Sequence, residues 1–127
     1  MSDRAKVRRI GETALPQTRS SLTAAAAIAI AVPDDSGKAV SYAYDEGRAA
    51  ERLLVGAGML GLAAGVSWIL PDKRQAIGSM LDIPPGWFVR TIVAIGHPTE
   101  AALAPKSQPG QARLPREQVV FEDRWQS

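Results

Sequence analysis

Cysteine is absent from this 127-residue chain, and histidine occurs only once. The lack of cysteine excludes disulfides, zinc–thiolate sites and thiol catalysis, and it makes the cytoplasm the expected compartment. No carboxylate, serine or second ligand stands at motif spacing from His97, so we expect this histidine to be structural. The sequence therefore predicts no metal site and no catalytic side chain.

A strong net charge is also missing. The formal net charge is +2, which is too small to indicate a nucleic-acid partner, and 46% apolar with 22% charged residues is ordinary for a globular protein. The length predicts one domain. We expect a mildly basic lead-in arm over residues 1–22, followed by a domain over 23–127 whose C-terminal arm begins at about 104. The arm is expected to be solvated and partly disordered or helical, with contact to phosphate or a membrane surface as the alternative.

Charged side chains are missing altogether from residues 53–70. As one helix this run would measure about 27 Å, close to the hydrocarbon thickness of a bilayer. Its four glycines weaken a helix, however, and residues 66–70 are typical of a strand. Flanking charges of mixed sign also argue against a membrane span. We therefore expect a helix over about 46–62, stopped by a left-handed glycine, and then a short buried strand.

The second half of this expected helix is apolar on all sides, because Val55, Met59 and Leu62 lie opposite the main apolar stripe. Such a helix needs two partners. One is the sheet of its own chain, and we expect the other to be the same helix of a second subunit, with glycine and alanine permitting close approach. The sequence thus predicts a homodimer through the helix over 46–62.

Three glycines of the run, Gly56, Gly58 and Gly61, also match the spacing of the dinucleotide-binding fingerprint. That fingerprint works at a turn that leaves a strand and opens a helix. Here the glycines fall inside a stretch that is already helical, so we interpret the match as accidental.

Before the central helix, residues 23–32 form an apolar run that ends at a proline- and glycine-containing turn. Ile28 and its neighbours alternate, and the run is predicted to be a strand buried on both faces. Residues 38–44 are expected to be extended, with Asp45 as the N-cap of the helix.

After the uncharged run, Asp72 is predicted to cap a short helix, with Gln75 at the reciprocal position of a capping box. Residues 87–95 are rich in β-branched and aromatic side chains and predict a well-buried strand. Residues 104–115 contain three prolines and predict a loop of positive character. Alternation over 119–125 predicts an edge strand, or an arm that reaches a neighbour.

Four short blocks occur in order between residues 23 and 125. They are Gly61-Leu62 with Ser67-Trp68-Ile69, Met80-Leu81-Asp82-Ile83-Pro84-Pro85-Gly86, Val93-Ala94-Ile95-Gly96-His97-Pro98, and Arg113-Leu114-Pro115 leading to Val119-Val120-Phe121-Glu122-Asp123-Arg124-Trp125. Each block is short, but together and in this order they resemble the FMN-dependent nitroreductase family.

The resemblance implies an α+β fold with a central mixed or antiparallel sheet packed on a long central helix, and a C-terminal arm exchanged in a dimer. It implies FMN at the dimer interface, carrying electrons from NAD(P)H to nitroaromatic or quinone-like acceptors. The small net charge and the mixed flanking charges independently predict no nucleic-acid and no membrane partner. The family's N-terminal arginine-rich turn for the FMN phosphate has no counterpart before residue 23, so the domain is expected to be N-terminally truncated. The alternative is a flavin-free dimerisation or interaction module without catalysis.

By the same resemblance, backbone groups of Ile69 and Leu70 would face the edge of the isoalloxazine ring, and Lys106 and Arg113 would meet the FMN phosphate. Pro71 weakens the first assignment because it has no N–H. The alternatives are an ordinary strand-to-helix turn and solvated loop charges. No acid–base residue is expected, because the flavin would supply the chemistry.

Overall fold

The computed structural model describes residues 1–14, 18–104, 107 and 114–124. The chain divides into two compact units, Met1–His97 and Pro98–Ser127. The first unit contains a sheet and the three longer helices, and the second contains only short helical turns within its described residues.

The sheet has three strands, β1 (Ala26–Pro33), β2 (Ala63–Trp68) and β3 (Trp87–Gly96), in the order β1-β3-β2. Both pairings are antiparallel, and β3 is the central strand. The prediction of a buried strand over 87–95 is confirmed. The prediction that the first strand is buried on both faces is wrong, because β1 lies at an edge and Ile28 is 37% exposed.

Helix α2 (Ala39–Met59) begins earlier than predicted. The chain turns at η2 (Ser36–Lys38), where the Asp35 carboxylate accepts a hydrogen bond from the Gly37 N–H, and the helix follows directly. Residues 39–44 are therefore helical rather than extended, and Asp45 lies inside the helix instead of capping it. Residues 38–46 include neither glycine nor proline, so the helix extends back to the turn.

The C-terminus of α2 is stopped by glycine, as predicted, but the helix ends at Met59 rather than at the expected Leu62. Gly61 has a φ of 71°, in the left-handed region. The N–H of Leu62 donates to the carbonyl of Ala57 at 2.9 Å and that of Gly61 donates to Gly58 at 3.0 Å, which is the Schellman pattern. The uncharged run is thus divided between helix and strand, and no helix in the described part of the chain is long and apolar enough to cross a membrane.

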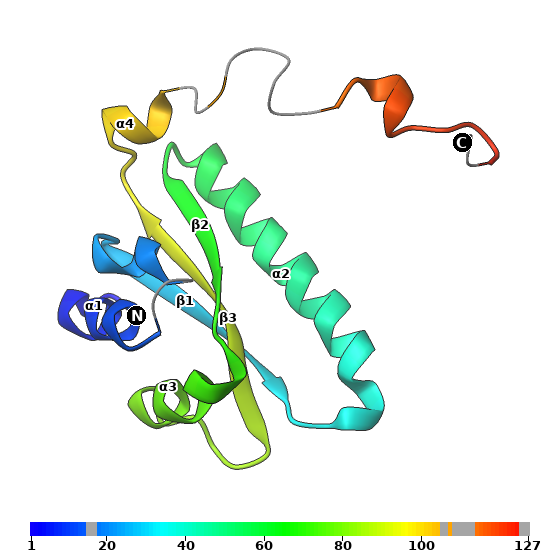
Figure 1. The fold of residues 1–127 in the computed structure, drawn as a ribbon. Coiled ribbons are helices and arrows are strands. Elements are labelled where there is room, and N and C mark those ends of the chain that lie inside the picture. The colour runs from blue at the N-terminus through cyan, green and yellow to red at the C-terminus, as the bar shows by residue number, and fades with distance from the viewer. Residues whose placement is uncertain (15–17, 105–106, 108–113, 125–127) are drawn as a thin grey trace. The chain divides into compact units, whose positions relative to one another are not determined.

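The sheet separates two helical layers (Figure 1): α2 covers one face, and α1 (Arg4–Thr13) and α3 (Arg74–Met80) cover the other. Helix α1 is capped by Asp3, whose carboxylate accepts from two backbone N–H groups. Val7 and Ile10 of α1 are fully buried. The helical alternative for the lead-in is therefore correct, and only its charged face is solvated.

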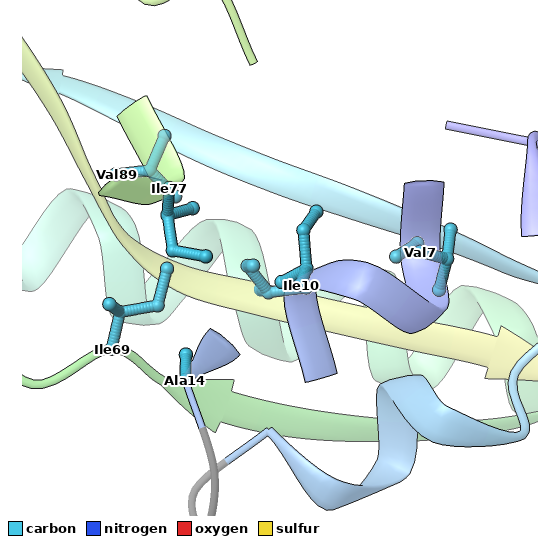
Figure 2. Packing of buried hydrophobic residues seen from close by; sticks show 8 residues of the cluster. Val7, Ile10, Ala14, Ile69, Ile77 and Val89 are labelled. Carbon is cyan, nitrogen blue, oxygen red and sulfur yellow. The ribbon is translucent and has the colours of Figure 1, made fainter. Parts of the chain in front are cut away.

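The main apolar core lies between the sheet and the α1–α3 layer. Figure 2 shows side chains from α1, α3, β3 and the end of β2 gathered there. The buried members of the cluster are Val7, Ile10, Ala14, Ala27, Ile69, Ile77, Val89 and Ile92. Branched aliphatic side chains from separate elements interlock here, and their burial is the main source of stability of the unit.

The capping box predicted at Asp72 and Gln75 is not formed. A 3-10 turn, η3 (Pro71–Lys73), precedes α3, and neither element has a side-chain cap. Asp72 instead pairs with Lys73 at 3.3 Å on the surface. Proline at the first helical position has no N–H and so needs no hydrogen-bond acceptor from a cap, which is consistent with a start that has no side-chain cap.

The second unit contains α4 (Glu100–Leu103), capped by the Thr99 hydroxyl, and η4 (Arg116–Gln118). No strand occurs over the described residues 114–124, so the edge strand predicted over 119–125 is wrong for that part, and Trp125 lies outside the described residues. Alternation alone does not make a strand where no neighbouring strand offers hydrogen bonds.

Candidate functional site

The end of β2 carries the two backbone positions predicted to face a flavin ring. The Ile69 side chain is fully buried in the apolar core, and its N–H donates to the Arg90 carbonyl at 2.7 Å. Leu70 follows with φ −59° and ψ 146°, and its carbonyl accepts from the Lys73 N–H at 2.9 Å. No partner is recorded for the Leu70 N–H within the described residues. Of the two predicted donors, only Leu70 is therefore free to bind a ligand.

The two predicted phosphate-binding residues, Lys106 and Arg113, lie outside the described residues. The geometry of the candidate site therefore rests on Ile69 and Leu70. Within the described residues, no group of three or more metal-ligating side chains lies close enough to hold a metal ion. The only histidine, His97, is exposed just beyond the end of β3.

A buried ion pair, which our sequence analysis did not predict, connects α2 to the sheet. The Glu46 carboxylate accepts from both Nε and Nη2 of Arg90, and Glu46 is only 3% exposed. The register shifts between Ile30 and Ala31 of β1, which leaves Arg90 without a partner on that strand. This bulge turns the Arg90 side chain toward α2.

Phe88 adds an aromatic surface beside this pair. The guanidinium carbons of Arg74 and Arg90 lie 5.1 and 5.9 Å from the centre of its ring.

The pattern around Glu46 offered one sequence signal. Glu46 lies one helical turn before Ala50 and three turns before Ala57, and both alanines are buried. A carboxylate in that register predicts a partner on the sheet.

The solvent face of α2 is apolar at both ends. Val40 and Tyr44 are each 72% exposed, Val55 is 53% exposed and Met59 is 84% exposed. Positions four or eleven apart fall on one stripe of a helix, so these four residues line a single face, opposite the one turned to the sheet. The middle of this stripe carries charged residues and a glycine, and shallow grooves run along it. We call this surface the outer stripe of α2; it consists of Val40, Tyr44, Gly47, Arg48, Glu51, Arg52, Val55 and Met59.

The three glycines that match a dinucleotide fingerprint do not form such a site. Gly56 and Gly58 belong to the last turns of α2, and Gly61 ends the helix. A phosphate-binding turn needs the opposite arrangement, with glycines that open a helix. The interpretation of this match as accidental is therefore correct.

A layered α+β unit with a long helix on an antiparallel sheet defines the chain as a protein of nitroreductase-like fold, and comparisons with solved structures establish this. Nitroreductase A from Vibrio parahaemolyticus is 21% identical with a TM-score of 0.73, and the match covers 100% of this chain and 57% of that one. The NADPH:FMN oxidoreductase from Vibrio harveyi, solved with NAD+, is 21% identical with a TM-score of 0.73, covering 100% and 58%. An FMN-dependent nitroreductase from Clostridium difficile is 21% identical with a TM-score of 0.75, covering 97% and 72%.

These identities are low, so the likeness establishes the fold, and the fold class expected from the sequence is confirmed. The chain spans little more than half the length of several of the solved structures that it matches, at 56% to 58% of them. No protein-family model matches the chain, and no curated protein matches it either.

Proposed function

We propose that this chain belongs to the nitroreductase family and forms part of an FMN-dependent NAD(P)H oxidoreductase that reduces nitroaromatic or quinone-like acceptors in the cytoplasm. The observation that carries the proposal is the fold likeness over the whole chain to proteins named as FMN-dependent nitroreductase and NADPH:FMN oxidoreductase. FMN would supply the electron-transfer chemistry, and the chain would bind and orient it.

The Leu70 amide is the described group that best fits a flavin. It lies at the end of β2 with its N–H unengaged, and neither neighbour can take its place. The Ile69 amide is already bonded to Arg90, and Pro71 has no N–H. We therefore assign the ring edge to Leu70 and withdraw Ile69 as a donor. Lys106 and Arg113 remain the proposed partners of the phosphate, where a guanidinium can make two parallel hydrogen bonds.

We further propose that two copies join along the outer stripe of α2 in an antiparallel arrangement about a two-fold axis. The stripe is self-complementary in that arrangement. With the axis between Ala49 and Ala50, Val40 lies opposite the partner's Met59, and Tyr44 lies opposite the partner's Val55. Arg48 then lies opposite the partner's Glu51, so apolar residues meet apolar residues and the charges at the centre are of opposite sign.

The test is flavin binding followed by turnover. Purified protein is titrated with FMN while flavin fluorescence is followed, and oxidation of NADH and of NADPH is then measured with a quinone. We expect FMN to bind. We also expect the rate at which FMN oxidises NADH or NADPH to depend on the protein. Arg113→Ala should weaken FMN binding, whereas the matched control Arg116→Ala, in η4, should not.

The alternative is a flavin-free dimerisation module, and two observations favour it: the Ile69 amide is engaged by Arg90, and the outer stripe of α2 exposes apolar residues. Protein that sediments as a dimer yet takes up no FMN would support this module and refute the enzymatic proposal.

A further inference from the structure

Arg90 holds the chain at the point where it leaves the sheet. One residue beyond β2, the Ile69 N–H donates to the Arg90 carbonyl at 2.7 Å. No hydrogen bond from Leu70 to β3 is recorded in the described part of the chain, and the Leu70 carbonyl accepts from Lys73 instead. A single main-chain hydrogen bond therefore fixes the end of β2, and Arg90 is its acceptor.

This hydrogen bond also orients the next amide. Successive N–H groups of an extended chain point to opposite sides, so the Leu70 N–H points away from β3 when that of Ile69 points toward it. Each peptide group is a rigid plane, and only the two backbone angles of Ile69 separate the two N–H groups. A shift of the Arg90 carbonyl is thereby passed on to the Leu70 amide.

The main chain of Arg90 is not held by β1. Ile30 pairs with Thr91 and Ala31 pairs with Val89, so no residue of β1 lies opposite Arg90. Such a bulge interrupts the ladder and turns the side chain of the bulged residue in a new direction. The position of Arg90 then depends on what its side chain binds.

Glu46 of α2 provides that hold. Its Oε2 accepts from Nε and Nη2 of Arg90, while the Arg90 guanidinium lies 5.9 Å from the centre of the Phe88 ring. The other oxygen, Oε1, is buried, and no partner is recorded for it among the described residues. A buried pair with an unsatisfied oxygen adds little net stability, because both charges lose their hydration. It does fix direction, since two nitrogens of a planar group meet one acceptor.

We infer that Arg90, locked by Glu46, is a positioning residue that sets the direction of the Leu70 amide toward the flavin. The inference rests on the proposed function, in which this amide meets the edge of the flavin ring. The two charged groups act through the Arg90 carbonyl and the Ile69 amide rather than by touching FMN. Loss of the pair therefore weakens FMN binding only while the Leu70 N–H is present to be misplaced.

The test is a double-mutant cycle in FMN affinity, measured by fluorescence titration. Glu46→Leu together with Arg90→Leu removes the pair, and Leu70→Pro removes the amide N–H. Loss of the pair should weaken FMN binding by about threefold in the native background, which is less than the loss of a whole hydrogen bond. The same loss should change FMN binding little in the Leu70→Pro background. If the double substitution prevents folding, Glu46→Gln, which keeps an acceptor but not the charge, replaces it with a smaller expected effect.

A second readout needs no flavin. Amide hydrogen exchange, followed by NMR in flavin-free protein, reports on the hydrogen bond between Ile69 and residue 90. Loss of the pair should speed exchange at Ile69 by about fivefold, the effect of one weakened hydrogen bond. Gly65, which pairs with Ala94 further along the same ladder, is the control and should change little.

The inference and the proposed function fail in different ways. Native protein that takes up no FMN refutes the proposed function, and the inference falls with it. If FMN binds, and loss of the pair weakens binding equally with and without the Leu70 N–H, the pair acts through the fold in general and the inference alone is overturned. Unchanged FMN affinity or unchanged exchange at Ile69 also overturns it. Weaker binding confined to proteins with the Leu70 N–H, together with faster exchange at Ile69, supports it.

Discussion

The two faces of the sheet are packed differently. Branched aliphatic side chains make the contacts on the face that carries α1 and α3. On the other face, the buried residues of α2 are Glu46, Ala50 and Ala57. The first face is a conventional close-packed core. The second has small side chains that let the helix approach the sheet, and one ion pair that fixes its position. Because the outer stripe of α2 is apolar as well, this helix is bound on one side and open on the other. The comparison indicates that stability resides mainly in the α1–α3 layer, whereas the α2 layer carries the exposed surface through which we propose association.

The largest effect is expected from the core. Ile92→Ala removes a fully buried side chain of β3 that packs with the α1–α3 layer. It should lower the free energy of unfolding by about 2–5 kcal/mol, the cost of lost burial plus the cavity left behind. Urea unfolding followed by circular dichroism measures this. Leu103→Ala, an exposed control in α4, should change stability by less than about 0.5 kcal/mol. Similar losses for the two variants would refute the assignment of the core.

The ion pair on the α2 face should come next. Glu46→Ala leaves the half-buried Arg90 without its carboxylate partner. It should lower the free energy of unfolding by about 3 kcal/mol. This is toward the lower end for broken buried pairs, because the Arg90 side chain is 30% exposed. Glu46→Leu together with Arg90→Leu removes both charges and should recover most of that loss. A double variant as unstable as Glu46→Ala would mean that the pair does not hold α2 to the sheet.

Features of the fold that depend on neighbouring residues could be predicted from the sequence, whereas features that depend on residues far apart in the chain could not. The strand at β3 and the stop at Gly61 were predictable, since each is encoded by neighbouring residues: a β-branched run, and a glycine at a helix end. The start of α2 was not, because Asp45 has the chemistry of a cap while the turn at Asp35 sets the boundary.

The candidate site shows the same limit. Leu70 could be indicated by resemblance, but the engagement of the Ile69 amide depends on Arg90, which becomes its neighbour only through the pairing of β2 with β3. The contact between Glu46 and Arg90 joins residues 44 apart and depends on a bulge that no local pattern reveals. The pattern over the described residues 119–124 was misleading as a strand signal, since alternation is present there and no strand is formed; the alternative, an arm that reaches a neighbour, stays a prediction.

Charge reversal on the outer stripe of α2 tests the open side of the helix. In the proposed dimer each Arg48 faces the partner's Glu51, and the symmetry makes this contact twice. Arg48→Glu should therefore weaken the dimer by about 1–2 kcal/mol, since two exposed pairs become repulsive. Adding Glu51→Arg in the same chain should restore most of the affinity. Sedimentation equilibrium measures both. Equal dimerisation of the native and single-variant proteins would show that α2 is not the interface.

The smallest effect is expected directly after β2, where consecutive amides differ: that of Ile69 bonds to the Arg90 carbonyl, and that of Leu70 has no partner among the described residues. Leu70→Pro removes the free N–H with little backbone strain, because the φ of Leu70 is −59° and proline prefers a similar value. Leu70→Ala shortens the side chain but keeps the N–H. If the amide binds the flavin, the proline variant should bind FMN about fivefold more weakly than the alanine variant, because it loses one hydrogen bond that contributes about 1 kcal/mol. Fluorescence titration of both variants, with matched thermal unfolding to exclude a stability effect, decides this. Identical FMN affinities would remove Leu70 from the site while leaving the fold and the dimer untouched.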